Sequence, residues 1–277
     1  MINFKNEETV SLHITEKCNL SCKHCYIDNN KKNIDIEKVE IALRSINPKN
    51  ILFYGGEPLL FPKVLKKIMY DFPDKKFGVH TNGTILNTEI LDKVDCIYLT
   101  IETFFFNHQN SWRPYSEFQW NNLKTILKKY KNKIRIIHNI YPTENDLSFF
   151  KIVTLSNMNY NTYPIILKNY IGEINYEDYK YLKPRTTFLI KPKLRILEDG
   201  TITRDMRGIY NICNYNEWKE EYRNYELPVS NKCLQCKYQK QCNFTNMFPH
   251  FCKDIIEHEK DEPYFCKVTK KLNESLF

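Results

Sequence analysis

The sequence predicts an α/β protein built on a parallel sheet, and two observations support that fold class. Short apolar runs rich in β-branched residues alternate with amphipathic stretches through the first two-thirds of the 277 residues, as in repeated strand–helix units. Hydrophobic residues make up 42% of the chain and aromatic residues 14%, which is enough material for a packed core. Five or six such units predict either an open doubly wound sheet or a full or partial barrel.

The expected strands are short and apolar, and amphipathic helices are expected between them. The strands are residues 10–15 (VSLHIT), 51–54 (ILFY), 77–80 (FGVH), 97–101 (IYLTI), 134–140 (IRIIHNI) and 163–167 (YPIIL). Asp35 is a suitable N-cap for a helix whose apolar face consists of Ile36, Val39, Leu43 and Ile46. Residues 59–72 and 118–131 carry similar apolar stripes.

The pattern changes near residue 185. Residues 186–205 predict a small hairpin with a turn at EDG, and a stretch with six of the ten cysteines follows. The sequence therefore predicts two domains, residues 1–185 and residues 186–277.

The charge and hydropathy of the chain indicate where the protein is located and which classes of partner it binds. The first residues contain no apolar signal core, and no apolar run approaches the roughly 18–20 residues that span a bilayer, so we expect a cytoplasmic protein with no membrane partner. Cysteines in a reducing compartment are metal ligands more often than disulfide partners. The net charge of +8 is scattered, which favours a solvated lysine-rich surface over a nucleic-acid-binding face and leaves an acidic substrate open.

Three cysteines stand close together directly after the first expected strand. Cys18, Cys22 and Cys25 have C-x3-C-x2-C spacing, and the C-terminal rim of a parallel sheet is where active sites collect. A zinc ion or a closed cluster normally takes four protein ligands. Three thiolates can instead hold three irons of a [4Fe–4S] cube and leave the fourth iron to a small molecule; a zinc loop with a distant fourth ligand is the alternative.

This loop resembles the signature of the radical S-adenosylmethionine (radical SAM) superfamily, C-x3-C-x-aromatic-C, with His24 at the ring-bearing position. YGGEP (54–58) resembles the glycine-rich element in which backbone groups and Glu57 would hold the amino group of S-adenosylmethionine (SAM). TNG (81–83) follows the third strand as in many members, and TIE (100–102) resembles the element that contacts the ribose. The resemblance covers about residues 9–185 and implies a partial (β/α)6 TIM-type barrel with a small cysteine-rich C-terminal cap.

The resemblance also implies the cofactor contacts and the chemistry. The implied SAM-binding residues are His24, Gly55, Gly56, Glu57, Pro58, Asn82, Thr100 and Glu102, and Arg135 is a candidate for the SAM carboxylate, with a surface role as its alternative. The cluster would pass one electron, supplied by a donor such as flavodoxin or ferredoxin, to the sulfonium of SAM. The 5′-deoxyadenosyl radical formed in this way would abstract hydrogen from a substrate.

The C-terminal cysteines resemble the SPASM and Twitch extensions, which carry auxiliary iron–sulfur clusters. The resemblance implies one auxiliary [4Fe–4S] cluster held by Cys233, Cys236, Cys242 and Cys266. Asp205 and Asn246 stand where further cysteines of the pattern would fall, so a second auxiliary cluster is not expected. A structural zinc ribbon is the alternative.

Three cysteines have no ligand role in this scheme. Cys213 or Cys252 could give a hydrogen atom to a substrate radical; the alternatives are that Cys213 replaces Cys266 as a ligand and that Cys252 is a buried small residue. Cys96 is expected to be a small core residue. The aromatic-rich residues 103–120 are expected to fill the seam between the domains or to lie over the barrel mouth.

The function implied by the resemblance is modification of a peptide substrate, as in maturases of ribosomally made peptides, by crosslinking or epimerisation. The first strand begins near residue 10, so we expect leader capture to need a separate leader-binding protein or the basic surface. Two alternatives stay open: a radical SAM enzyme acting on a small molecule such as a sugar or nucleotide, and a non-enzymatic metal-binding protein that has kept the fold.

Overall fold

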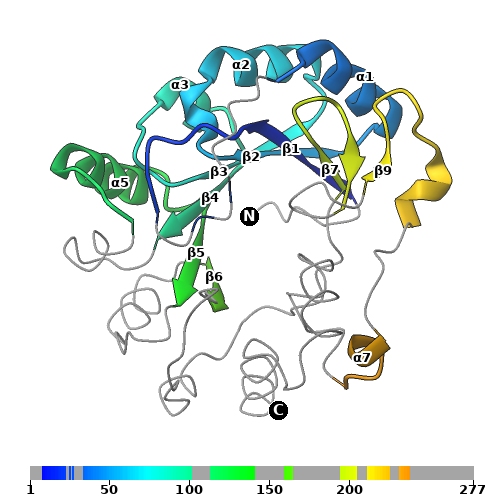
Figure 1. The fold of residues 1–277 in the computed structure, drawn as a ribbon. Coiled ribbons are helices and arrows are strands. Elements are labelled where there is room, and N and C mark those ends of the chain that lie inside the picture. Colours follow the sequence, from blue (N-terminus) through cyan, green and yellow to red (C-terminus); the bar gives the residue numbers. More distant parts are fainter. Residues whose placement is uncertain are drawn as a thin grey trace.

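A computed structural model describes residues 8–22, 25, 27, 34–101, 113–140, 159–164, 194–204, 211–224 and 231–237 (Figure 1). Its strands are β1 (Thr9–Thr15), β2 (Asn50–Gly55), β3 (Lys76–Thr81), β4 (Cys96–Ile101), β5 (Ile134–Ile140), β6 (Asn159–Pro164), β7 (Leu194–Ile196), β8 (Ile202–Thr203) and β9 (Asn211–Cys213). Its α-helices are α1 (Ile36–Ile46), α2 (Pro62–Asp71), α3 (Thr88–Leu91), α5 (Glu117–Lys129) and α7 (Asn231–Leu234), with 3-10 helices η2 (Pro58–Leu60) and η4 (Glu220–Asn224).

The described strands form one sheet with the order β6-β5-β4-β3-β2-β1-β7-β8-β9. Every neighbouring pair from β6 to β7 is parallel, and the pairs β7–β8 and β8–β9 are antiparallel. Helices α1, α2, α3 and α5 lie along the outer side of the curved sheet (Figure 1), because crossovers between parallel strands place their helices on a sheet face. The α/β fold with a partial parallel barrel is therefore confirmed.

The two faces of the sheet differ in chemistry because side chains alternate along each strand. Val10, Leu12 and Ile14 of β1 face the helices and belong to the main hydrophobic core. Other core residues on this side are Phe53, Val79, Leu99 and Ile136 from the strands and Val39, Leu43, Leu65, Ile68, Leu123 and Ile126 from the helices. The opposite face carries a small apolar cluster of Leu52, Cys96 and Tyr98 together with polar side chains. The expected core role of Cys96 is confirmed, since it is 1% exposed.

Capping residues set the starts of the two main amphipathic helices. The side chain of Asp35 accepts a hydrogen bond from the Lys38 amide, which confirms Asp35 as the N-cap of α1. Ser116 and Gln119 form a reciprocal capping box at the start of α5. The apolar stripe of residues 118–131 predicted α5, but this capping box was not predicted.

Five of the expected strands are confirmed within one residue of their predicted bounds, and the sixth begins earlier than expected. β6 covers Asn159–Pro164, so only its last two residues fall in the predicted 163–167, and residues 165–167 lie outside the described residues. Its polar start carries no apolar signal, and pairing with β5 supports it instead. The short helix α3 was not predicted.

β1 lies inside the sheet with partners on both edges. It pairs with β2 and, in parallel, with β7, and all seven of its residues are buried. β7 and β8 form the expected hairpin, but these strands continue the sheet of the first domain rather than standing apart from it. The predicted boundary at residue 185 lies outside the described residues.

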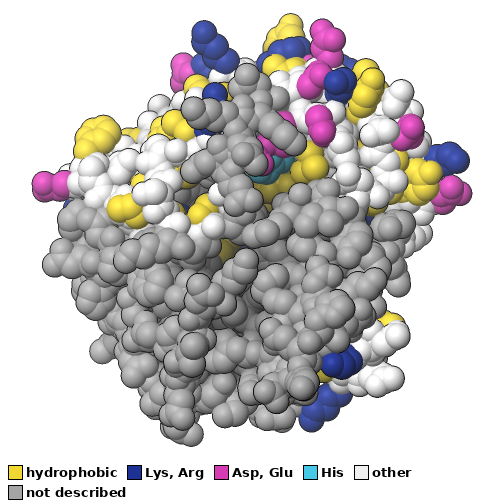
Figure 2. Space-filling view, viewed as in Figure 1, with side chains coloured by type: hydrophobic (Ala, Val, Ile, Leu, Met, Phe, Trp, Pro, Cys, Tyr) yellow, Lys and Arg dark blue, Asp and Glu magenta, His cyan; other side chains and the backbone are white. Residues whose placement is uncertain are grey.

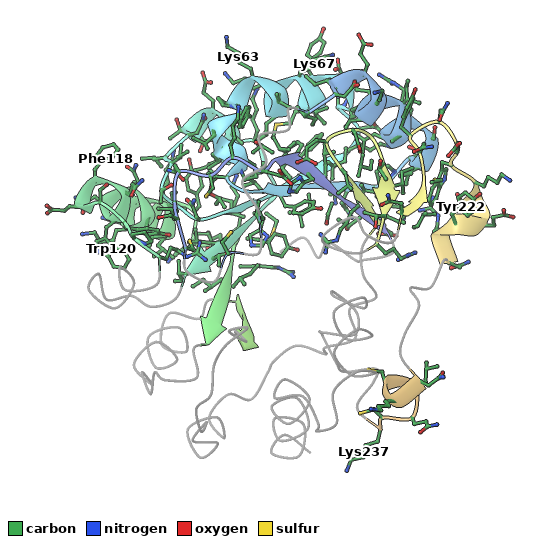
Figure 3. All side chains as sticks on the ribbon, viewed as in Figure 1. Lys63, Lys67, Phe118, Trp120, Tyr222 and Lys237 are labelled. Atoms are coloured by element: carbon green, nitrogen blue, oxygen red, sulfur yellow. The ribbon has the colours of Figure 1, made fainter. Side chains whose placement is uncertain are left out.

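The helical surface mixes both signs of charge (Figure 2). Lys63 and Lys67 project from α2 away from the sheet (Figure 3), and Lys67 Nζ lies 2.8 Å from Glu40 and 2.7 Å from Asp71. These ion pairs are typical of a solvated face. Within the described residues, no helix is long and apolar enough to cross a bilayer.

Candidate active site

The predicted motif residues that the structure describes meet at the C-terminal ends of β1, β2 and β3. The cysteine loop follows β1, Gly55–Pro58 ends β2 and starts η2, and Thr81–Gly83 follows β3. Because parallel strands end at the same edge of a sheet, the three motifs become neighbours.

Two glycines let the end of β2 pack against the start of the cysteine loop. The Gly56 amide donates to Thr15 O (2.7 Å) and the Glu57 amide donates to Lys17 O (2.9 Å). A Cβ at Gly56 would lie 2.3 Å from Lys17 O, and Gly55 has a φ of +141° and equally close contact with Thr15 O. Side chains would therefore push the loop away. The two glycines therefore keep the start of the cysteine loop, which leads directly to Cys18, close to the end of β2.

Glu57 links the ends of β2 and β3 through a fully buried carboxylate. Its oxygens accept hydrogen bonds from the amides of Leu59 (3.0 Å) and Asn82 (2.8 Å) and from Thr81 Oγ1 (2.9 Å). Burial raises the pKa of Glu57 to about 7, against the opposing effect of these donors and of Arg113. In the structure, this carboxylate accepts hydrogen bonds from groups of the protein itself. Its contact with the SAM amino group stays a prediction.

Asn82 joins the third motif to the cysteine loop. Its Nδ2 donates to Cys18 Sγ (3.7 Å) and to Asn19 Oδ1 (3.1 Å). Its Oδ1 accepts from the amide (2.9 Å) and the hydroxyl (2.6 Å) of Thr84, and its carbonyl accepts from Tyr115 Oη. The roles of Asn19, Thr84 and Tyr115 were not predicted from the sequence. The turn-forming run TNGT was the available signal for Thr84.

The three cysteines lie on one loop and are not joined by disulfides. Cys18 and Cys22 are half-buried and Cys25 is exposed, and the Cys25 amide donates to Cys22 O (3.1 Å). Burial raises the pKa of the Cys18 thiol, and the negative charges of Glu57 and Cys25 raise it further. Among the described residues, no three His, Cys, Asp or Glu side chains already converge as ligands of a single ion. Three thiols on one loop, with the side-chain N–H of Asn82 directed at one of them, form a donor set that suits an iron–sulfur cluster.

Two groups of polar and aromatic side chains line the sheet face opposite the helices. In the first group, the rings of His13 and Tyr54 meet edge to face with centroids 4.8 Å apart, and His13 Nδ1 lies 2.6 Å from Glu198 Oε1. The guanidinium of Arg195 lies 5.1 Å from the centroid of the Tyr54 ring. The Nε of Arg195 is buried and has no hydrogen-bond partner among the described residues.

The second group contains two predicted cofactor contacts. Arg135 is half-buried, with its guanidinium 5.9 Å from the centroid of the Tyr98 ring. Thr100 Oγ1 lies 2.7 Å from His80 Nε2. Arg135 therefore stands on the inner face of the sheet rather than on the outer surface.

The remaining predicted site residues are only partly described. Pro58 is buried at the start of η2. Cys233 lies on α7 and Cys236 lies just after this helix, and the Cys236 amide donates a hydrogen bond to Cys233 O (3.1 Å). Cys213, on β9, is half-buried against the main core, and burial raises its thiol pKa. The predictions for several further positions concern residues outside the described ones: His24, Glu102, residues 103–112, Cys242, Cys252 and Cys266.

Comparisons with known proteins agree with this geometry. Residues 12–155, just over half of the chain, match the family model described as the radical SAM superfamily. An uncharacterized protein of Methanocaldococcus jannaschii is 29% identical over 134 residues, which is 43% of this chain and 46% of that protein. An S-adenosylmethionine-dependent nucleotide dehydratase of a Fibrobacter species is 28% identical over 245 residues, 80% of this chain and 65% of that protein. The chain thus spans less than two thirds of the length of both relatives.

A solved structure extends the likeness to the fold of almost the whole chain. The structure of anSMEcpe with bound AdoMet and the Cp18Cys peptide superposes with a TM-score of 0.65 and covers 96% of both chains at 14% identity. At this identity, the likeness concerns the fold.

Proposed function

The chain belongs to the radical SAM superfamily, and from that premise we propose that Cys18, Cys22 and Cys25 bind its [4Fe–4S] cluster and that its substrate is an anionic small molecule of the nucleotide type. Family membership makes the protein an iron–sulfur enzyme that uses SAM. The cluster and SAM supply one-electron chemistry when bound. The residues of the chain hold the ligand loop, orient SAM and bind the substrate.

The inner sheet face supports the assignment of SAM contacts. Arg135 is a half-buried cation on that face, which suits the SAM carboxylate. The Thr100 hydroxyl on the neighbouring strand suits a ribose hydroxyl, with Glu102 two residues further along. Glu57 fixes Thr81 and Asn82 through hydrogen bonds, and in this proposal its carboxylate also contacts the SAM amino group together with backbone groups of the glycine-rich element.

Arg195 is the observation that carries the substrate class. It is a second cation on the same face, held against Tyr54, with a buried Nε that has no described acceptor. A buried guanidinium nitrogen without a partner is costly unless an acceptor binds there. A phosphate or carboxylate would supply that acceptor, and the aromatic rings of Tyr54 and His13 beside it suit a flat ring. The relative that covers 80% of the chain is a nucleotide dehydratase, which agrees with this class.

The test measures SAM cleavage with candidate substrates. The protein is reconstituted anaerobically and reduced with dithionite, and 5′-deoxyadenosine is quantified with SAM alone, with each nucleoside triphosphate, and with peptides encoded beside the gene. We expect one nucleotide to accelerate 5′-deoxyadenosine formation and to be converted. Arg195→Met should raise the KM for that nucleotide by roughly 10–100-fold, the value of a charge-assisted hydrogen bond, and leave SAM cleavage without substrate unchanged.

Arg44→Met is the matched control. Arg44 also lies over an aromatic ring, 4.8 Å from the Phe72 centroid, but it is exposed on α1. The Arg44→Met protein should have the same KM for the nucleotide as the unmodified protein. If no nucleotide accelerates the reaction, or if both arginine variants behave alike, the proposed substrate class is wrong.

A peptide substrate is the second candidate. The anSMEcpe structure with a bound peptide shares the fold along 96% of the chain, and the turn that brings Cys233 and Cys236 together supports an auxiliary cluster completed by Cys242 and Cys266. Acceleration by a peptide from a neighbouring gene, with a mass change in that peptide, would favour this candidate. A separate leader-binding protein and a flavodoxin or ferredoxin donor belong to the same proposal.

A further inference from the structure

Asn82 holds its side-chain amide in one orientation beside a predicted cluster ligand. The backbone amide of Thr84 can only donate, so the atom 2.9 Å away from it must be the Asn82 oxygen. Nδ2 therefore faces the cysteine loop, and it donates one hydrogen bond to Asn19 Oδ1 and another to Cys18 Sγ. Asn19 closes the ring of hydrogen bonds by donating to Thr84 Oγ1 (2.8 Å).

The surroundings keep this donor in place. Asn82 is 5% exposed and Thr84 is 2% exposed. The backbone of Asn82 is held on both sides, because its amide donates to Glu57 and its carbonyl accepts from Tyr115. A side chain bound at this many points loses little further entropy when it donates to a charged sulfur.

We infer that Asn82 is a positioning residue that raises the reduction potential of the N-terminal cluster through its hydrogen bond to Cys18. Reduction adds one electron to the cluster and increases the negative charge on its sulfur ligands. A donor directed at a ligand sulfur stabilises this more negative form more than the oxidised form. The inference rests on the proposed ligand role of Cys18, Cys22 and Cys25, and it assigns Asn82 a role in electron transfer rather than in SAM binding.

The experiment measures the potential directly. Asn82→Leu removes the donor without adding charge, and Asn82→Asp keeps the acceptor for Thr84 but replaces the donor with a carboxylate. Asn122→Ala is the control, because Asn122 Nδ2 supports the same turn through Thr84 O (2.8 Å) and does not bond to the sulfur. Each full-length protein is reconstituted, its iron is counted, and it is titrated anaerobically with dithionite as the one-electron source. The N-terminal cluster is recognised by the change of its EPR signal when SAM is added.

We expect Asn82→Leu to shift the reduction equilibrium of that cluster about tenfold toward the oxidised form, which is ~59 mV for one electron. Asn82→Asp should shift it further, because its negative charge opposes reduction. Asn122→Ala should leave the potential unchanged.

Other outcomes separate this inference from the proposed function. If the unmodified protein shows no cluster whose signal responds to SAM, the proposed ligand set fails. If that cluster is present and Asn82→Leu has the same potential as the unmodified protein, Asn82 does not tune it. If both Asn82 variants lose iron while Asn122→Ala keeps it, Asn82 only supports the loop and the inference is overturned.

Discussion

Glu57 should make the folded protein less stable as the pH rises toward neutrality, and Glu57→Gln should remove this dependence. The Glu57 carboxyl has no exposed surface, and burial raises its pKa from the ordinary value of 4.5 to about 7. A raised carboxyl pKa means that the folded protein binds the proton more tightly than the unfolded chain does. The stability that this proton contributes is therefore fully present below pH 4.5 and is lost progressively as the pH rises through about 7.

The two pKa values set the size of the effect. Between about pH 5.5 and about pH 8.5, this carboxyl lowers the free energy of unfolding by roughly 2 kcal/mol. The amide of Glu57→Gln has no proton to lose in this range. The new side-chain amide can accept a hydrogen bond from one of the two backbone amides, but its own NH2 group faces the other. This unsatisfied pair of donors lowers the free energy of unfolding by about 1–2 kcal/mol at every pH. The unmodified protein should therefore be the more stable of the two at the acidic end, and the difference should shrink as the pH rises.

The assay is urea unfolding of the reconstituted protein, followed by circular dichroism under anaerobic conditions across this pH range. Glu89→Gln is the control, because Lys66 lowers the pKa of the exposed Glu89 carboxyl and so moves its titration below the range. Parallel pH profiles for the unmodified protein and Glu57→Gln would show that Glu57 does not titrate there and would refute the argument from burial.

Three further predictions concern the metal content and the support of the site. Reconstituted protein should hold about eight irons, and replacing Cys18, Cys22 and Cys25 together by Ala should leave about four; about four irons with stoichiometric zinc in the unmodified protein would favour the zinc ribbon. Gly56→Ala should lose the iron of the N-terminal site, because its Cβ would lie 2.3 Å from Lys17 O; full iron content would show that the loop can move. Ser116→Ala should lower the free energy of unfolding by about 1 kcal/mol through loss of the capping box, whereas Ser45→Ala, on an exposed helix face, should change it little.

Local patterns were sufficient where the partners of a residue are close in sequence. Asp35 caps α1 through Lys38, three residues away, and the apolar face of that helix repeats at helical spacing. The alternation in β1 likewise identifies which side chains face the helices. For these elements, sequence and structure express the same periodicity.

Long-range contacts explain what the sequence did not reveal. The start of β6 is polar, and β5 supplies its backbone partners. β7 pairs with β1 although Leu194 and its partner Val10 are far apart in the sequence, and no local pattern indicates this pairing. The contact of Glu57 with SAM stays a prediction from the resemblance, whereas its hydrogen bonds with Thr81 and Asn82, more than twenty residues away in the sequence, were not predicted. The sequence motifs identified the residues of the site, but the hydrogen bonds between them became visible only in the structure.

β1 gains its second neighbour only late in protein synthesis. Val10 pairs with Leu194 and Leu12 pairs with Ile196, so as the chain leaves the ribosome β1 has β2 alone beside it until residues 194–196 have been made. During that interval its other edge presents unpaired backbone groups to any passing strand. The cysteine loop follows this strand directly, so the strand that precedes the predicted iron ligands has both edges paired only after residues 194–196 have been made. Iron delivered to a nascent chain shorter than this would meet a loop whose supporting strand still lacks one of its two neighbours.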